Sequence, residues 1–391
     1  MNGFRLSAAV MAHPRRLERA AALRDRFPEL NVQIAVDPDP DGPPSALRSA
    51  RVAWRQAAPG ATHHLVLQDD VAAPADLPDR IRALVAARPS DPVSLVAEWG
   101  AISASLVRIA ALHGAGWAPV VDVYVPSYGL VLPAELARGF DEYAARSGPG
   151  DGADDTVLGA YLRDQRVTAY LPVPHVLDHD TEPAVSSIVG NSAMGARRSA
   201  CPPPPDAAAD LARTVATPPV VPYLCWWLGQ SVCLRQDTAA PGGWRRVPSE
   251  VILRERGIDA REVNDLLAGP VNAVRGCAAA LGLHLTLVTE VGRTAFLLGL
   301  LAGEAWPAGR DVDAALETPV ARAALDSLAP GGLRRFVEPP QLDRLSRLLE
   351  PLVRHGTREG LRRSGAARAQ AVGTESVLGG RWDRCGRVGA E

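Results

Sequence analysis

The part of the sequence best suited to chemistry is a short apolar run that ends in two adjacent carboxylates. Residues 63–71 read HHLVLQDDV, so Asp69 and Asp70 directly follow the apolar residues. Because a buried strand carries no charges in its middle, we expect both aspartates where the strand leaves the sheet, the edge at which open α/β sheets bind ligands. Two acids there repel each other unless a cation or strong donors lie between them. The alternative is a helix N-cap followed by an acidic loop residue.

Two further polar groups follow the first two expected strands. Residues 13–16 read HPRR and contain His13 and Arg16, which stand where a strand gives way to a helix. A helix N-terminus with arginines suits a phosphate, and the alternative is a proline-started helix with a solvated basic turn. Asp37 ends the second expected strand. It is placed to accept hydrogen bonds from a base or a ribose, or it is a turn residue.

A late Asp-His pair completes the series. Asp178 and His179 follow an expected strand and the proline-containing segment 172–177. A lone histidine is usually structural, whereas one in a polar pair after a strand is a candidate metal ligand.

The elements that must position these residues alternate between strands and helices. This alternation predicts an α/β protein with a mostly parallel sheet flanked by helices. The expected strands are 4–11, 32–36, 65–67, 93–97, 120–125, 128–132 and 167–171, and the expected helices are 15–27, 46–58, 76–87 and 152–163.

The composition changes to proline and alanine at 197–222, where four consecutive prolines at 202–205 favour an extended linker. From 223 the pattern is mostly helical, with one expected strand at 283–289 among helices at 259–267, 271–281, 294–302, 312–328 and 341–353. We therefore expect a catalytic domain at 1–196, a linker at 197–222, a mainly helical domain of unknown role at 223–360 and a flexible tail at 361–391.

Composition excludes several classes of function. At 391 residues two domains are expected, and a net charge of −2 argues against a general nucleic-acid binder. The chain has no lysine, so arginine, histidine or backbone amides must make any phosphate contact. Its 5 cysteines show no C-x-x-C spacing, which indicates neither a disulfide framework nor a zinc ribbon and favours the cytoplasm. The longest apolar run, 295–303, is far shorter than the ~20 residues of a membrane span.

Taken in order, the motifs resemble those of GT-A-fold glycosyltransferases related to the bacterial family 2 and family 25 enzymes, over about residues 4–195. Each piece is short, and the order and spacing carry the match. The pieces are His13-Pro14-x-Arg16, the Asp37 strand end, Leu65-Val66-Leu67-Gln68-Asp69-Asp70, Tyr128-Gly129, the helix start Asp154-Asp155, and residues 173–179 (VPHVLDH) with Ser186-Ser187 behind them.

The resemblance implies a nucleotide-sugar donor, with UDP favoured, and a Mn²⁺ or Mg²⁺ ion that bridges its two phosphates. Asp70 would be the direct metal ligand, Asp69 would assist, and His179 would complete the site. A divalent ion neutralises the charge of a pyrophosphate leaving group without a proton. Oxygen ligands and one imidazole suit Mn²⁺ or Mg²⁺ better than zinc.

Three further positions follow from the same resemblance. Asp154 or Asp155 matches the acidic pair that supplies the base for the acceptor hydroxyl in inverting members, and we prefer Asp155. Gln68 stands where the family often has an acid, so it lowers the negative charge of the site while still able to bond a ribose or a metal-bound water. Trp99, after a strand, either faces the donor or acceptor pocket or packs in the core.

An aromatic group opens the second half of the chain. Tyr223, Trp226, Trp227 and Trp244 are either a platform for stacking a sugar ring or part of the core.

Three functions are open from the sequence. The leading one is a metal-dependent glycosyltransferase, whose helical half binds the hydroxyl acceptor, a partner protein or a second copy of the chain. The second is a non-catalytic nucleotide-binding or scaffold protein on the same fold, which Gln68 and the unassigned second half motivate. The third is a nucleotidyltransferase, which would normally show a glycine-rich basic N-terminal loop, and residues 13–16 lack the glycines.

Overall fold

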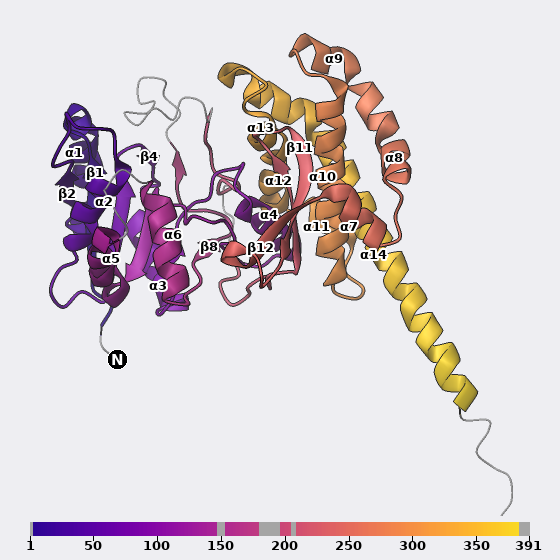
Figure 1. Cartoon of the computed structure of the whole chain (residues 1–391), viewed down its shortest axis with the longest axis horizontal. Helices are drawn as coiled ribbons and strands as arrows, with labels where there is room; N and C mark the ends of the chain where they lie inside the picture. Colours follow the sequence, from indigo (N-terminus) through magenta and orange to yellow (C-terminus); the bar gives the residue numbers. More distant parts are fainter. Residues whose placement is uncertain (1–2, 147–152, 180–195, 205–208, 383–391) are drawn as a thin grey trace, which may run out of the picture.

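A seven-stranded sheet organises the N-terminal half in the computed structural model, which describes residues 3–146, 153–179, 196–204 and 209–382 (Figure 1). The strand order is β2-β1-β3-β7-β5-β8-β6, and all strands except β7 and β6 run in one direction. This confirms the expected α/β class with a mostly parallel sheet. The strands are β1 Leu6–Ala12, β2 Gln33–Val36, β3 His63–Gln68, β5 Val93–Ser94, β6 Trp117–Pro119, β7 Gly129–Pro133 and β8 Tyr170–Pro172.

Helices cover both faces of this sheet because successive strand residues point to opposite sides. Val10 and Leu65 belong to the core under α1 (Leu17–Arg26) and α3 (Leu77–Ala87). Their neighbours Ala9 and Val66 belong to a second core. That core lies under α2 (Ala46–Arg55), α5 (Ala134–Arg146) and α6 (Asp154–Asp164).

The strand register gathers the polar strand ends at one edge. β1 pairs in parallel with both β2 and β3, and Met11 lies opposite Ala35 and Gln68. The residues that follow these three strands therefore lie side by side at the carboxyl edge of the sheet. A two-stranded sheet fixes the next turn, because β4 (Val71–Ala72) pairs with β9 (Asp178–His179) and places Val71 opposite His179.

The C-terminal half begins with a three-stranded antiparallel sheet, which the sequence pattern did not predict. It contains β10 Val220–Cys225, β11 Gln230–Gln236 and β12 Trp244–Pro248. The following helices are α7 Ser249–Glu255, α8 Ala260–Ala273, α9 Arg275–Ala280, α10 Leu285–Glu304, α11 Val312–Leu316, α12 Pro319–Asp326, α13 Leu328–Leu333 and α14 Leu342–Trp382.

Two expected strands were wrong. The segment 283–289 is the start of α10, whose N-cap His284 accepts a hydrogen bond from the Thr286 backbone N–H. The segment 120–125 is irregular, and the strand there is β6, which ends at Pro119. Both are short apolar runs, for which periodicity does not separate a strand from other buried structure.

The two halves share one hydrophobic core. Helix α4 (Ser103–His113) is buried along its whole length and packs with α10 and α12. Its Arg108 donates to the Ala324 carbonyl at 3.1 Å and to Ser327 Oγ at 2.8 Å. The segment expected as a linker also contributes, since Cys201 is fully buried and β10 begins at Val220. Residues 205–208 of that segment lie outside the described residues.

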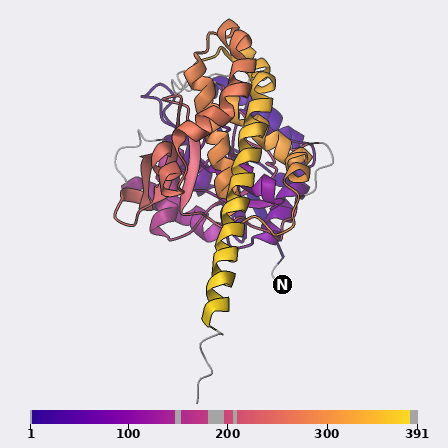
Figure 2. The same ribbon diagram turned by 90° about the vertical axis from the view of Figure 1, so that its right-hand side faces the viewer.

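Helices α10 and α14 cross closely, as Figure 2 shows for the C-terminal half. The crossing depends on glycine, because a Cβ built on Gly360 would lie 2.0 Å from the Phe296 carbonyl oxygen. The helix α14 continues to Trp382, into the region expected as a flexible tail. Helix α10 is apolar and long enough to span a membrane, but 72% of its apolar window is buried inside the protein, as in a core helix.

A glycine-to-alanine pair in α14 tests this packing. Gly360→Ala should lower the free energy of unfolding by about 1–3 kcal/mol or more, because the methyl group overlaps the α10 backbone. Gly365→Ala, where a Cβ meets nothing within 4 Å, should be neutral or stabilising by about 0.5–1 kcal/mol. Urea unfolding measures both, and equal effects would contradict the close crossing.

Candidate functional site

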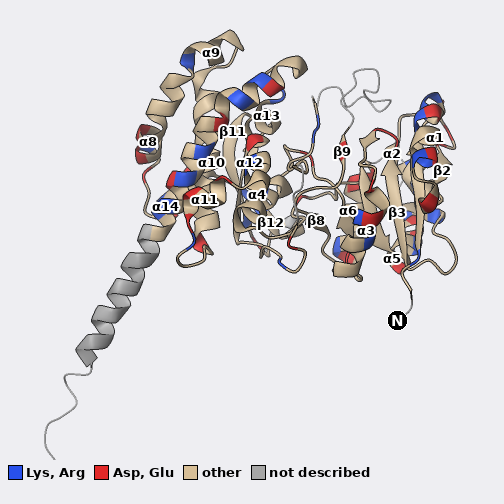
Figure 3. Ribbon diagram, turned by 180° about the vertical axis from the view of Figure 1, so that it is seen from behind, with Lys and Arg blue, Asp and Glu red and all other residues tan. Residues whose placement is uncertain are grey.

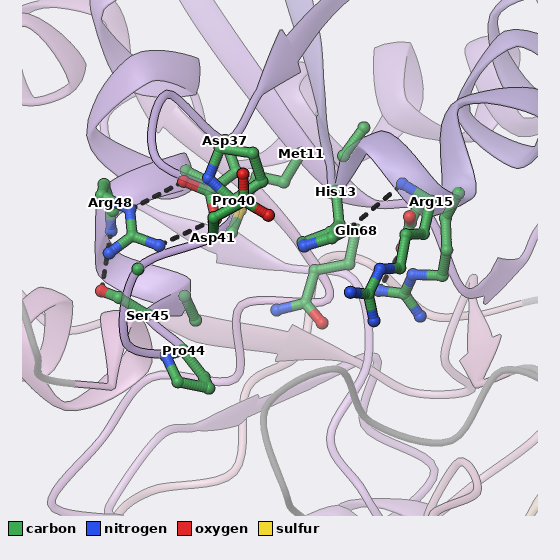
Figure 4. A pocket seen from close by; sticks show the side chains of 16 residues that line it. Met11, His13, Arg15, Asp37, Pro40, Asp41, Pro44, Ser45, Arg48 and Gln68 are labelled. Atoms are coloured by element: carbon green, nitrogen blue, oxygen red, sulfur yellow. Dashed lines mark hydrogen bonds and ion pairs between the residues drawn. The ribbon is translucent and has the colours of Figure 1, made fainter.

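A cavity of about 350 Å³ opens at the carboxyl edge of β1, β2 and β3 (Figure 4). Five residues singled out from the sequence line it together: His13, Arg16, Asp37, Gln68 and Asp69. They come from three different strand ends, and the parallel register brings them to one place. The remaining wall contains Arg15, Arg48 and the loop 40–46.

The basic side of the cavity is the turn after β1. His13 Nδ1 accepts a hydrogen bond from the Arg15 backbone N–H at 3.1 Å and so caps the short helical turn Pro14–Arg16. Proline at the start of that turn fixes its backbone. Arg15 and Arg16 both line the cavity, so two guanidinium groups are available to a phosphate.

The opposite side is an ion pair between Asp37 and Arg48. Arg48 donates to both carboxylate oxygens, at 2.7 Å from Nε and 3.0 Å from Nη2. Asp37 also accepts from the Asp39 backbone N–H at 3.1 Å. The hydrogen bond from Arg48 lowers the pKa of Asp37, although burial opposes this. A ligand would therefore meet an ionised, rigidly held Asp37–Arg48 pair rather than a free carboxylate.

Arg16 stands between the two adjacent aspartates. Its guanidinium is 2.7 Å from Asp69 Oδ1 and 3.5 Å from Asp70 Oδ2. Burial raises the pKa of Asp69 to about 7, although Arg16 opposes the shift. For Asp70 burial is outweighed by His179 and then by Arg16 and Arg197, which together lower its pKa. The two neighbours thus titrate apart, an arrangement typical of sites that work with protons or cations.

His179 lies beside Asp70 because of the β4–β9 pairing. Its Nε2 is 3.5 Å from Asp70 Oδ2, and the edge of its ring meets Tyr128 with centroids 5.2 Å apart. Asp69 Oδ2 and Asp70 Oδ1 are buried and accept no hydrogen bond from the part of the chain that the structure describes. Buried carboxylate oxygens normally have partners, so these two call for a cation or a donor from a ligand.

The donor set at this point suits a divalent cation that is shared with a ligand. Among the described residues, no group of three or more His, Cys, Asp and Glu side chains is arranged to hold a metal ion. Asp70 and His179 nevertheless supply a carboxylate and an imidazole, and Asp70 Oδ1 is unsatisfied. Mg²⁺ is commonly bound through one or two carboxylates plus substrate phosphates and water, so these residues fit such an ion.

The acidic pair at the start of α6 lies beyond Gln68. Gln68 Nε2 donates to Ser127 Oγ at 3.2 Å. Burial, then the neighbouring Asp155, raises the pKa of Asp154 to about 6, and Asp154 Oδ2 finds no partner among the described residues. Burial also raises the pKa of Asp155, whose Oδ1 accepts from the Thr156 backbone N–H at 2.6 Å. Neither aspartate lines the cavity itself.

Trp99 does not line the cavity, and its contacts favour the second of the two roles open from the sequence, packing in the core. Its side chain is buried, and its indole N–H donates to the Ala196 carbonyl at 3.0 Å. Its own carbonyl accepts from Arg108 at 2.8 Å. These are the contacts of a core residue between the two halves. Ser186 and Ser187, which formed part of the resemblance, lie outside the described residues.

The sequence pattern missed two charged residues near Tyr128, Arg197 and Glu98. Arg197 Nη1 donates to the Tyr128 hydroxyl at 3.2 Å, and the Arg197 charge contributes to the lowered pKa of Asp70. Glu98 is buried and pairs with Arg334 Nη2 at 2.9 Å. Glu98 follows an apolar strand segment, the same signal that identified Asp37. Arg197 falls in the segment that was interpreted as a linker, and so it was not considered.

No family model matches the chain, and no curated protein matches it. The α/β architecture is what the structure establishes, and the resemblance to GT-A-fold glycosyltransferases stays a prediction.

The pH dependence of stability tests the burial of Asp69. Because burial raises the pKa of Asp69 in the folded protein to about 7, above its ordinary value of 3.8, the folded state holds the proton more tightly, and stability falls as pH rises through this window. Asp69→Asn removes the cost of ionising this buried carboxyl. The free energy of unfolding of the variant minus that of the native protein should therefore rise by roughly 1–3 kcal/mol between pH 5 and pH 8. Urea titrations at several pH values measure it. The control Asp79→Asn, at an exposed position of α3, should show a difference that stays constant with pH. The same constant difference for Asp69→Asn would contradict a buried Asp69 that holds its proton.

Proposed function

We propose that the protein is a metal-dependent glycosyltransferase that moves a sugar from a nucleoside-diphosphate donor, with UDP favoured, to a hydroxyl acceptor. The observation that carries the proposal is the cavity at the carboxyl edge of the sheet, lined by arginines and Asp69, with Asp70 next to it on the other side of Arg16. Its volume of about 350 Å³ falls in the range of small-molecule sites.

In this proposal the donor lies along the cavity, with its nucleoside on one side and its diphosphate on the other. The Asp37–Arg48 pair offers both a donor and an acceptor to the nucleoside, while Arg15 and Arg16 face the diphosphate. The planar guanidinium pairs with phosphate oxygens through two parallel hydrogen bonds. Since Arg16 also contacts Asp69 and Asp70, binding of the diphosphate would draw its charge away from those carboxylates.

Asp70 and His179 are the residues that would hold Mn²⁺ or Mg²⁺, whose chemistry is to neutralise the charge that develops on the diphosphate leaving group. Asp69 supports that site through its ion pair with Arg16. Gln68 leaves the site with one acid fewer than the family it resembles, and its amide is held by Ser127.

Asp155, with Asp154 as the second candidate, would act as the base. In an inverting transfer the acceptor hydroxyl oxygen forms a bond to the anomeric carbon, and the bond to the diphosphate oxygen breaks with both electrons leaving on the diphosphate. The hydroxyl proton passes to the carboxylate. Burial raises the pKa of both aspartates, which strengthens them as bases.

The second candidate is a non-catalytic protein that binds a nucleotide in the same cavity. It is favoured by Gln68 and by the lack of a three-ligand cluster within the described ranges. For either function the cytoplasm is proposed as the location, because the described cysteines, Cys201, Cys225, Cys233 and Cys277, are free thiols. Basic and acidic residues are interspersed along the helices in Figure 3, and we propose no nucleic-acid partner.

Calorimetric titration with UDP separates the two candidates. For the glycosyltransferase, Mn²⁺ should tighten UDP binding by about tenfold or more, since Asp70 and the diphosphate would hold the ion together. Asp70→Asn should remove this effect of Mn²⁺, and the exposed control Asp79→Asn should retain it. Equal UDP affinity with and without Mn²⁺ in the native protein would support the non-catalytic binder instead.

Sugar transfer tests the base. With a panel of nucleotide sugars read by mass spectrometry, the native protein should release UDP from one donor and transfer or hydrolyse its sugar. Asp155→Asn should lower the rate by roughly 10²–10⁴-fold while UDP affinity is retained. If instead Asp154→Asn alone lowers the rate, the base is Asp154. If neither substitution lowers it, the acidic pair does not supply the base.

A further inference from the structure

Three of the large hydrophobic residues exposed within the described ranges gather at one place, the turn between β10 and β11. Trp227 is 52% exposed and Leu228 51%, and both lie in that turn. Phe336, 37% exposed, lies against it, because a Cβ on Gly229 would come within 3.1 Å of its ring. Nothing in the proposed donor site uses these residues.

Two arginines order the aromatic side chains of this turn. The Arg334 guanidinium lies 4.2 Å from the centre of the Trp226 ring, and that of Arg335 lies 3.8 Å from the Trp227 ring. The two indole rings are 4.7 Å apart at 47°. The two guanidinium groups therefore lie over the indole rings and fix them, and the exposed part of Trp227 forms an aromatic surface beside the exposed Arg335.

A continuous chain of contacts joins this surface to the Asp70 end of the cavity. His179 touches Tyr128, and Tyr128 accepts a hydrogen bond from Arg197. Two residues further on, Ser199 pairs with Glu98 in a β-bridge. Glu98 binds Arg334, which lies over Trp226.

The ion pair in the middle of this chain is rigid. The Arg334 side chain is fully buried and that of Glu98 is 7% exposed. Gly100 leaves the room for it, because a Cβ there would lie 2.0 Å from Arg334 Nη1. A buried pair of this kind is costly to break, so it holds the aromatic surface in a fixed position relative to the cavity.

We propose that Trp226 and Trp227 form the subsite that binds a carbohydrate acceptor, an assignment that rests on the proposed glycosyltransferase function. The C–H face of a sugar ring packs on exposed aromatic surface, and its hydroxyls take hydrogen bonds from a neighbouring charged group, which the exposed Arg335 beside Trp227 can supply. The exposed part of Trp227, Leu228 and Phe336 is roughly 300 Å², below the ~800 Å² per partner of a stable protein interface. A patch of this size suits a ligand of one or two sugar rings.

Saturation-transfer NMR on the full chain tests the subsite, with cellobiose, maltose and lactose as probes and UDP with diamagnetic Mg²⁺ in the same samples. At least one disaccharide should show transfer to its ring C–H protons. Trp227→Ala should weaken that signal by about fivefold or more, and Trp227→Phe should restore part of it. The control Phe4→Ala, which removes another exposed aromatic ring, should change nothing. The UDP signal should be the same in all variants.

The outcomes separate this subsite from the donor site. UDP signals without any disaccharide signal, or disaccharide signals unchanged in Trp227→Ala, overturn the subsite and leave the donor site standing. Disaccharide signals that need Trp227 without any UDP signal overturn the proposed function and with it the assignment to an acceptor. A concentration-dependent dimer that Trp227→Ala abolishes shows that a second copy of the chain covers the surface, and this also overturns the proposal.

Discussion

The structure of the site depends on how the charge of two buried, adjacent carboxylates is compensated. Asp69 and Asp70 leave β3 together, and a single guanidinium, that of Arg16, contacts both. Compensation is incomplete, since one oxygen of each carboxylate has no partner among the described residues. A cation bound beside the two carboxylates would complete it. The pairing of β4 with β9 places His179 beside Asp70, where its imidazole can help to compensate the charge of that carboxylate.

The second constraint is the shared core of the two halves. Helix α4 leaves the sheet and is buried among C-terminal helices, and the ion pair Glu98–Arg334 crosses the same boundary. The C-terminal half is therefore fixed against the site rather than tethered to it by a linker. This is why a surface on the β10–β11 turn can have a defined position relative to Asp70.

The sequence predicted well which polar residues meet at the carboxyl edge of β1, β2 and β3, because the signal for each strand end is local. Strands with an apolar pattern that end in Asp37 and in Asp69–Asp70 need only the parallel register to bring their ends together. Contacts between distant segments gave no such signal. The packing of Trp99 and the place of Arg197 both depend on tertiary contacts that cross more than fifty residues of chain. The proline-rich composition at 197–222 concealed buried residues such as Cys201.

The central claim is that Asp70, His179 and a nucleoside diphosphate bind one divalent cation together. Electron paramagnetic resonance of Mn²⁺ tests this directly, because the signal of the free ion falls when it is bound. With the protein in excess, adding UDP should lower the free Mn²⁺ signal far more than the same UDP lowers it without protein. Both His179→Ala and Asp70→Asn should abolish the difference. Equal free Mn²⁺ with and without the protein, at a UDP concentration that saturates the cavity, would contradict the account.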